Sequence, residues 1–176
     1  THPVTESRIA DTRNRAEQSK PGGKEDSLRY QLIRARVQLQ YEDTSGLAAK
    51  RFQAQLDENP KNDVARYGLA IAQIKASQFK QARDSLQPLL AKAPNDITYN
   101  LAQIQLDIDN SRLADAQQRT DRMLTQYPGN YPLNQIRVDL LLKQNRTADA
   151  EKALDGLLKS RPDDPDVWYQ VAETRG

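Results

Sequence analysis

The chain has 176 residues, of which 37% are hydrophobic and 28% charged, a balance typical of a globular protein with a sizeable core. Lys and Arg number 26 against 24 for Asp and Glu, and the two signs are interspersed, so the sequence lacks the basic block that a nucleic-acid partner would need. The absence of cysteine excludes disulfides and Cys-based zinc sites, and no apolar run approaches the roughly 20 residues of a transmembrane helix.

The first 23 residues differ from the rest of the chain. Residues 6–18 could form a short helix, with Thr5 as its candidate cap, and the stretch Lys20-Pro21-Gly22-Gly23 is typical of a linker. We therefore expect residues 1–23 to form a separate segment that ends in a linker, ahead of a main domain over residues 24–176.

A 34-residue period runs through the main domain. Four kinds of residue keep it, namely Pro60, Pro94, Pro128 and Pro162; Ala48, Ala82, Ala116 and Ala150; Leu56, Leu90, Leu124 and Leu158; and Asn62, Asp96, Asn130 and Asp164. This pattern resembles the tetratricopeptide repeat, a helix–turn–helix unit that stacks into a solenoid. The sequence therefore predicts an all-α fold whose function lies in a surface made by stacking.

Four hairpins and a partial fifth are expected, over residues 24–62, 63–96, 97–130, 131–164 and 165–176. Their helices are predicted at residues 28–41 and 47–59, 64–76 and 79–93, 97–109 and 112–127, 132–144 and 147–160, and from 165 onward. Because a solenoid needs its last face covered, we expect Val167, Trp168 and Val171 to be partly exposed, or the natural protein to continue, and we favour continuation.

Each phased position has a physical reason. The alanine is small where two helices cross at close range, so Ala82→Leu should overpack its hairpin at a cost of about 1–3 kcal/mol. The proline ends each second helix because it has no backbone donor. The Asn or Asp two residues later can accept hydrogen bonds from the free amides that begin the next helix, at about 1 kcal/mol per cap.

The sequence contains no catalytic constellation. His2 is the single histidine, which excludes a histidine pair, an HExxH motif and a Ser-His-Asp set within the chain. We expect neither an enzyme nor a cofactor in these 176 residues alone.

The candidate binding surface is the concave face, which the first helix of each hairpin lines. The family's groove positions correspond to a mixed apolar and polar set, namely Tyr30, Ile33, Val37, Val64, Tyr67, Ile71, Lys75, Leu101, Gln105, Asp109, Gln135, Asp139 and Lys143. Domains of this family that grip a C-terminal carboxylate use Lys and Asn where this chain has residues such as Ile33 and Leu101. A helix or an extended segment of a partner protein is the expected ligand, with the alternative that Tyr67 and Ile71 only pack against the next helix.

The segment Thr1-His2-Pro3-Val4-Thr5-Glu6-Ser7-Arg8-Ile9 resembles a stretch near the end of the catalytic domain in membrane-associated HExxH zinc metallopeptidases related to the CAAX prenyl proteases. Followed by tetratricopeptide repeats, it resembles the periplasmic metallopeptidases of Gram-negative bacteria that act in outer-membrane protein assembly and quality control. The resemblance implies a periplasmic parent in which His2 is an additional zinc ligand and Arg8 a neighbour of the active site.

The HExxH motif and the downstream glutamate ligand of that family are absent from this chain, so zinc chemistry would need another portion of the protein. The resemblance implies that the repeats recruit unfolded or misassembled outer-membrane proteins, or dock on the barrel-assembly machinery. Two alternatives stay open: a free-standing adaptor with no proteolytic link, and a metal-dependent enzyme complete in this chain.

Overall fold

The computed structural model describes residues 27–40, 45–160, 162–163 and 165–175, and every regular element in these ranges is an α-helix. The predicted all-α solenoid is confirmed. The predicted segment at residues 1–23, including the helix at 6–18, lies outside the described residues. None of the described helices is both long and apolar enough to cross a bilayer.

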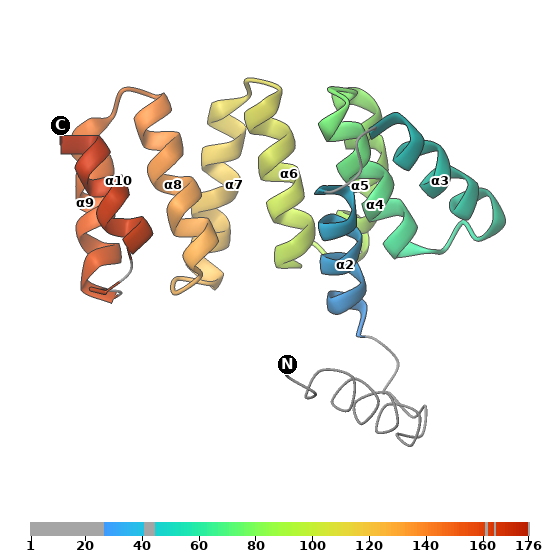
Figure 1. Ribbon diagram of the computed structural model, residues 1–176, viewed down its shortest axis with the longest axis horizontal. Coiled ribbons are helices and arrows are strands. Elements are labelled where there is room, and N and C mark those ends of the chain that lie inside the picture. The colour runs from blue at the N-terminus through green and yellow to red at the C-terminus, as the bar shows by residue number, and fades with distance from the viewer. Residues whose placement is uncertain (1–26, 41–44, 161, 164, 176) are drawn as a thin grey trace, which may run out of the picture.

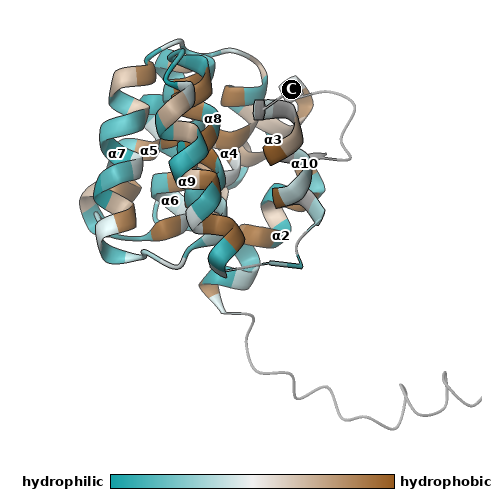
Figure 2. Cartoon of the chain, turned by 90° about the vertical axis from the view of Figure 1, so that its left-hand side faces the viewer, coloured by the Kyte–Doolittle hydropathy of each residue, from teal (hydrophilic) through white to brown (hydrophobic). Residues whose placement is uncertain are grey.

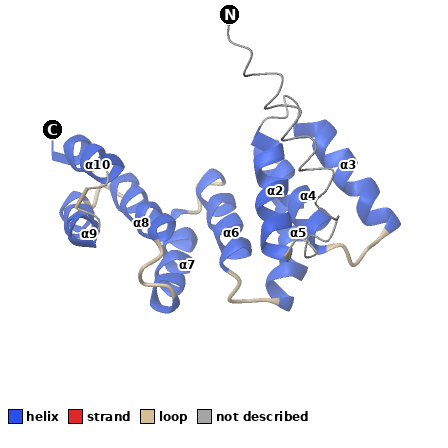
Figure 3. Ribbon diagram, turned by 60° about the horizontal axis from the view of Figure 1, so that its bottom comes forward, coloured by secondary structure: helices blue, strands red, loops and turns tan. Residues whose placement is uncertain are grey.

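The helices follow the predicted boundaries to within about two residues (Figure 1). In chain order they are α2 (Leu28–Gln40), α3 (Ser45–Glu58), α4 (Asp63–Lys75), α5 (Phe79–Lys92), α6 (Ile97–Asp109), α7 (Leu113–Gln126), α8 (Tyr131–Lys143), α9 (Thr147–Ser160) and α10 (Pro165–Arg175). Figure 3 shows them as a row with α3 at one end and α9 and α10 at the other.

The predicted caps form at the start of three first helices. The side chains of Asn62, Asp96 and Asn130 accept hydrogen bonds of 3.0, 3.0 and 3.1 Å from the backbone N–H three residues later. Each cap satisfies one of the amides that a helix start leaves unpaired. The fourth phased residue, Asp164, lies outside the described residues.

The first helices also end alike. Ser77, Ser111 and Asn145 follow α4, α6 and α8 with φ of 56°, 57° and 58°, in the left-handed region. The residue after each of these donates its backbone N–H to the carbonyl oxygen five residues earlier. The donors are Gln78, Arg112 and Arg146, and the N···O distances are 2.8, 2.7 and 2.9 Å. This is the Schellman arrangement, and its recurrence every 34 residues gives the three turns the same geometry.

A third recurring contact closes each junction between repeats. The carbonyl oxygen of each phased proline accepts a side-chain hydrogen bond from the residue six positions later, and these donors are Arg66 (2.8 Å), Asn100 (2.9 Å), Asn134 (3.0 Å) and Trp168 (2.7 Å). The donors are themselves 34 residues apart. The bond therefore joins the turn after each second helix to the first helix of the next repeat.

The helix interfaces bury the phased alanines almost completely, as the sequence predicts. In the later repeats α4 packs on α5, α6 on α7 and α8 on α9, and each second helix packs on the first helix that follows it. Within the described residues, the first pair differs from a closed hairpin, because α2 and α3 both pack on α4 and make little contact with each other. Apolar residues form clusters where the helices pack together, and the colouring of Figure 2 shows that much of α7 is hydrophilic.

The buried apolar residues form three clusters along the row. One joins α2 to α6, the second lies among α6, α7 and α8, and the third joins α8 to α10. Val167 and Val171 belong to the third cluster at 0% and 5% exposure, so the predicted exposure of these two valines is wrong. Packing of α10 on α9 covers them, and Trp168 alone of the three is exposed, at 54%.

Candidate functional site

The predicted groove residues of α2 form an exposed apolar line. Tyr30, Ile33 and Val37 have exposed fractions of 53%, 50% and 47%. Their spacing of three and four residues puts them on one side of the helix. We call these three residues the α2 stripe.

The predicted groove residues of α4 occupy a different environment. Tyr67 and Ile71 are buried at 0% and 8% exposure, and Val64 packs half-buried against the same core. The Tyr67 ring lies 6.0 Å from the ring of Tyr99, centroid to centroid, and burial raises the pKa of its hydroxyl, which lies near Arg36 without a well-aligned hydrogen bond. The structure thus places Tyr67 and Ile71 in the packed interior, as the alternative interpretation of the sequence has it.

Lys75, at the end of α4, is exposed, and its ammonium group donates a hydrogen bond to the carbonyl of Leu39 near the end of α2. This contact ties the two first helices together where both end. The side chain has a structural role in the free protein.

The predicted groove residues of α6 and α8 are mostly polar, and three of them, Asp109, Asp139 and Lys143, are exposed. Leu101 is half-buried against the second core cluster, while Gln105 donates to Asp109 over 2.7 Å one turn later. On α8, Gln135 donates to the Tyr131 hydroxyl over 2.8 Å. Desolvation by the neighbouring residues raises the pKa of Asp139, although its side chain is exposed, and the charge of Lys143 opposes that shift.

His2 and Arg8, the residues tied by resemblance to a zinc centre, lie outside the described residues. Among the residues that are described, no group of three or more His, Cys, Asp or Glu side chains could hold a metal ion. The described residues therefore do not supply a zinc site, and no chemical step through zinc follows from them.

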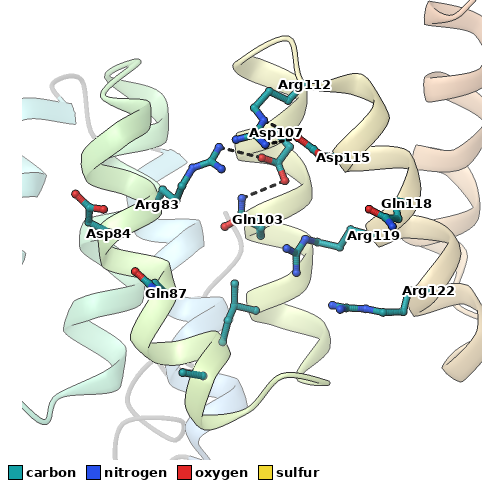
Figure 4. A pocket seen from close by; sticks show the side chains of 12 residues that line it. Arg83, Asp84, Gln87, Gln103, Asp107, Arg112, Asp115, Gln118, Arg119 and Arg122 are labelled. Atoms are coloured by element: carbon teal, nitrogen blue, oxygen red, sulfur yellow. Dashed lines mark hydrogen bonds and ion pairs between the residues drawn. The ribbon is translucent and has the colours of Figure 1, made fainter.

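One hollow among the described helices lies on a face that sequence reasoning missed. A cavity of about 680 Å³ opens between α5, α6 and α7 (Figure 4). It is lined by Arg83, Asp84, Gln87, Leu90, Ala91, Gln103, Asp107, Arg112, Asp115, Gln118, Arg119 and Arg122. We call it the arginine cavity.

A buried carboxylate organises one wall of the arginine cavity. The side chain of Asp107 is 3% exposed and accepts hydrogen bonds from Arg83 over 3.2 Å and from Gln103 over 3.1 Å. At the rim, Arg112 donates to Asp115 over 2.6 Å, and Figure 4 shows both sets of contacts. These pairs neutralise two of the four arginines.

A buried amide holds the other two arginines of the cavity. Asn100 is fully buried, and its amide nitrogen donates to the backbone carbonyls of Pro94 and Asp96. Its amide oxygen accepts from Arg119 over 3.0 Å and from Arg122 over 3.1 Å. The spacing of Arg119 and Arg122 is visible in the sequence, but the cavity beside them appears only when α5 and α7 stack across α6.

The comparisons with known proteins agree with the fold. The family model described as tetratricopeptide repeat matches residues 46–105 and 107–173. A tetratricopeptide repeat protein from Parabacteroides merdae superposes with a TM-score of 0.68 at 14% identity, over 97% of this chain and 64% of that one. A thermophilic tetratricopeptide repeat protein in Thermus thermophilus superposes with a TM-score of 0.64 at 22% identity, over 83% of this chain and 80% of that one.

Two curated relatives share the name beta-barrel assembly-enhancing protease. The Escherichia coli K12 protein is 34% identical over 124 residues, and the Yersinia pestis protein is 34% identical over 125 residues. Each match covers 68% of this chain and 25% of the relative, so the chain spans about a quarter of the length of these relatives. The similarity, the helical architecture and the recurring caps support one conclusion: the chain is a repeat region similar to that protease and belongs to the tetratricopeptide repeat family.

Proposed function

We propose that this chain is the recruiting region of a periplasmic zinc metallopeptidase that acts in outer-membrane protein assembly and quality control. The observation that carries the proposal is the 34% identity to proteins named beta-barrel assembly-enhancing protease. In this proposal, the zinc and the HExxH motif come from sequence outside these 176 residues. The repeats contribute a surface that holds unfolded client polypeptide near the peptidase and so raises its effective concentration there.

The α2 stripe supports the recruiting role. Its three side chains are about half exposed in the free protein, so a client segment can bury more of each. Full burial of an Ile or Val side chain contributes about 1.5–3 kcal/mol, which leaves roughly 1 kcal/mol per side chain for binding. The polar side chains of α6 and α8, including Gln105 and Gln135, can supply hydrogen bonds to a bound peptide backbone.

A binding experiment tests this surface. A urea-unfolded outer-membrane β-barrel polypeptide is diluted into the purified chain, and binding is followed by fluorescence anisotropy. The double substitution Ile33→Ser and Val37→Ser should weaken binding by roughly tenfold or more, since about 1 kcal/mol is lost at each position. Leu47→Ser is the matched control, because Leu47 is also an exposed aliphatic residue, at 68%, but lies on α3.

Equal weakening by the control and the double variant would contradict the α2 stripe as the binding surface, and so would unchanged binding by the double variant. Alanine substitutions at Tyr67 and Ile71 are unsuitable for this test, because both side chains are buried and their loss would disturb folding. The proteolytic link is tested separately by reading the sequence encoded before Thr1 for an HExxH motif. A free-standing adaptor would lack it.

A further inference from the structure

The charges around the arginine cavity are unevenly paired. Of its four arginines, Arg83 pairs with Asp107 and Arg112 with Asp115. Within the described part of the chain, neither Arg119 nor Arg122 has a carboxylate at ion-pair distance, and their shared partner is the neutral amide oxygen of Asn100. Two guanidinium groups therefore face the cavity without a direct ion pair, although the lining also includes the carboxylate of Asp84, and Asp107 and Asp115 lie close enough to favour the charged form of Arg119.

Arg119 is the less satisfied of the two. It is half-buried, and its Nε lies buried with no hydrogen-bond partner among the described residues. Burial lowers the pKa of its guanidinium, and the positive charge of Arg122 lowers it further. Because a partly buried cation is stabilised by a counter-charge, an anion in the cavity would supply the ion pair that Arg119 lacks.

The fold itself does not require these arginines. In the next repeat, the 34-residue register replaces Arg119 and Arg122 by Ala153 and Gly156, which line a separate cavity of about 480 Å³. Asn134, the counterpart of Asn100, makes the same two hydrogen bonds to backbone carbonyls beside that cavity. The junction therefore forms without an arginine, and the pair at 119 and 122 is free to serve another purpose.

We propose that the arginine cavity binds the carboxylate side chains of an acidic, extended polypeptide segment of a partner protein. Guanidinium groups form paired, charge-assisted hydrogen bonds with carboxylates, which suits Arg119 and Arg122 as the anchors. The cavity volume exceeds that of a single carboxylate. Gln87 and Gln118 can bond a peptide backbone, while Leu90 gives an apolar contact. This site is separate from the α2 stripe and stands whether or not a peptidase is attached.

Fluorescence anisotropy with a labelled short peptide of alternating Glu and Ser, against the same peptide with Gln in place of Glu, tests the proposal. The Glu peptide should bind the full chain, and the Gln peptide should bind at least about tenfold more weakly, since its amides cannot replace the carboxylates. Arg119→Gln with Arg122→Gln should weaken the Glu peptide by a similar factor. Arg146→Gln is the matched control, because Arg146 lies outside this cavity and is already paired with Asp149 at 2.7 Å.

A second measurement needs no substitution. Titration of the Glu peptide into the isotopically labelled, unchanged chain should shift backbone amide resonances of α5, α6 and α7 around the cavity in an NMR spectrum. Shifts confined to other helices, equal binding of the two peptides, or unchanged binding by the folded double arginine variant would overturn the proposal. Inorganic phosphate that shifts the same resonances while the peptide does not would also overturn it, in favour of a small-anion site.

Discussion

The hydrogen bond onto each phased proline carbonyl shows how one repeat junction tolerates different side chains. The donor is a guanidinium at Arg66, an amide at Asn100 and Asn134, and an indole N–H at Trp168. The backbone at each junction requires only that an N–H group lie near the proline carbonyl and point toward it. Any side chain that brings an N–H there closes the junction.

Asn134 allows this contact to be measured. Its amide donates to the carbonyls of Pro128 over 3.0 Å and Asn130 over 2.9 Å. Asn134→Ala should lower the free energy of unfolding by about 1–2 kcal/mol, because both acceptors lose their side-chain donor. Urea denaturation followed by circular dichroism gives the value. Asn134→Arg should retain most of the stability, as Arg66 makes the same bond in an earlier repeat, and an alanine variant as stable as the original would contradict this role.

The sequence predicted some of these residues and missed others for a physical reason. The caps at Asn62, Asp96 and Asn130 were predictable because capping needs a short side chain with an acceptor, which restricts the position to a few residue types. The donors at positions 66, 100, 134 and 168 were not predictable, because Arg, Asn and Trp all carry a side-chain N–H but differ in size, charge and polarity. A repeat of residue identity every 34 positions therefore reveals the capping positions but not the positions of the N–H donors.

At the scale of helices, α3 and α4 meet through a large and a small side chain. A Cβ atom added to Gly68 would lie 2.5 Å from two ring atoms of Phe52, which is buried. The 34-residue register gives Leu86 with Ala102 and Thr120 with Ile136 as the corresponding pairs. Across these first three pairs the second-helix residue becomes smaller as the first-helix residue becomes larger, whereas the fourth pair, Leu154 with Gln170, does not follow this trend.

The substitution Gly68→Ala tests this close approach. It should destabilise the protein by about 1–3 kcal/mol through overpacking against Phe52, even though alanine is the better helix former. The added substitution Phe52→Leu should recover part of that loss, because a smaller side chain makes room for the new methyl group. Urea denaturation of the four proteins of this double-mutant cycle measures the coupling.

Gly156→Ala supplies the control for that cycle. Gly156 lies within α9, and a Cβ added there meets nothing within 4 Å. The substitution should stabilise the protein by up to about 1 kcal/mol through helix propensity alone. A gain in stability at Gly68 as large as that at Gly156 would show that Phe52 does not restrict the position.

Across the solenoid, the predicted groove residues are exposed on α2 but buried on α4, because these two first helices have different numbers of neighbouring helices. α4 packs against α2, α3, α5 and α6, which buries Tyr67 and Ile71. α2 packs mainly on α4 and keeps the α2 stripe exposed. The repeat pattern predicted which residues lie on first helices. The burial of Tyr67 and Ile71 depends on the packing of both α2 and α3 against α4, which the 34-residue pattern does not predict.

Alkaline pH gives a test of the packed interior between α4 and α6. Burial, together with the nearby carboxylates of Asp63 and Asp96, raises the pKa of Tyr99 to about 12, against a value of 10.0 for an ordinary tyrosine. Below pH 10 the tyrosine is protonated in both folded and unfolded chains, so its contribution to stability is fully present. Between pH 10 and about 12 the unfolded chain loses this proton while the folded chain keeps it, and the free energy of unfolding should fall.

Tyr99→Phe should make that fall less steep, because it removes a group that binds a proton in the folded chain and has lost it in the unfolded chain. The urea midpoint of each protein, measured at intervals from pH 10 to pH 12, gives the slope. Tyr30→Phe is the matched control, since it removes a hydroxyl from an exposed position outside the core. The same slope in the Tyr99→Phe variant and the unchanged protein would mean that the Tyr99 hydroxyl reaches solvent, and that the α4–α6 interface is open where the structure shows it closed.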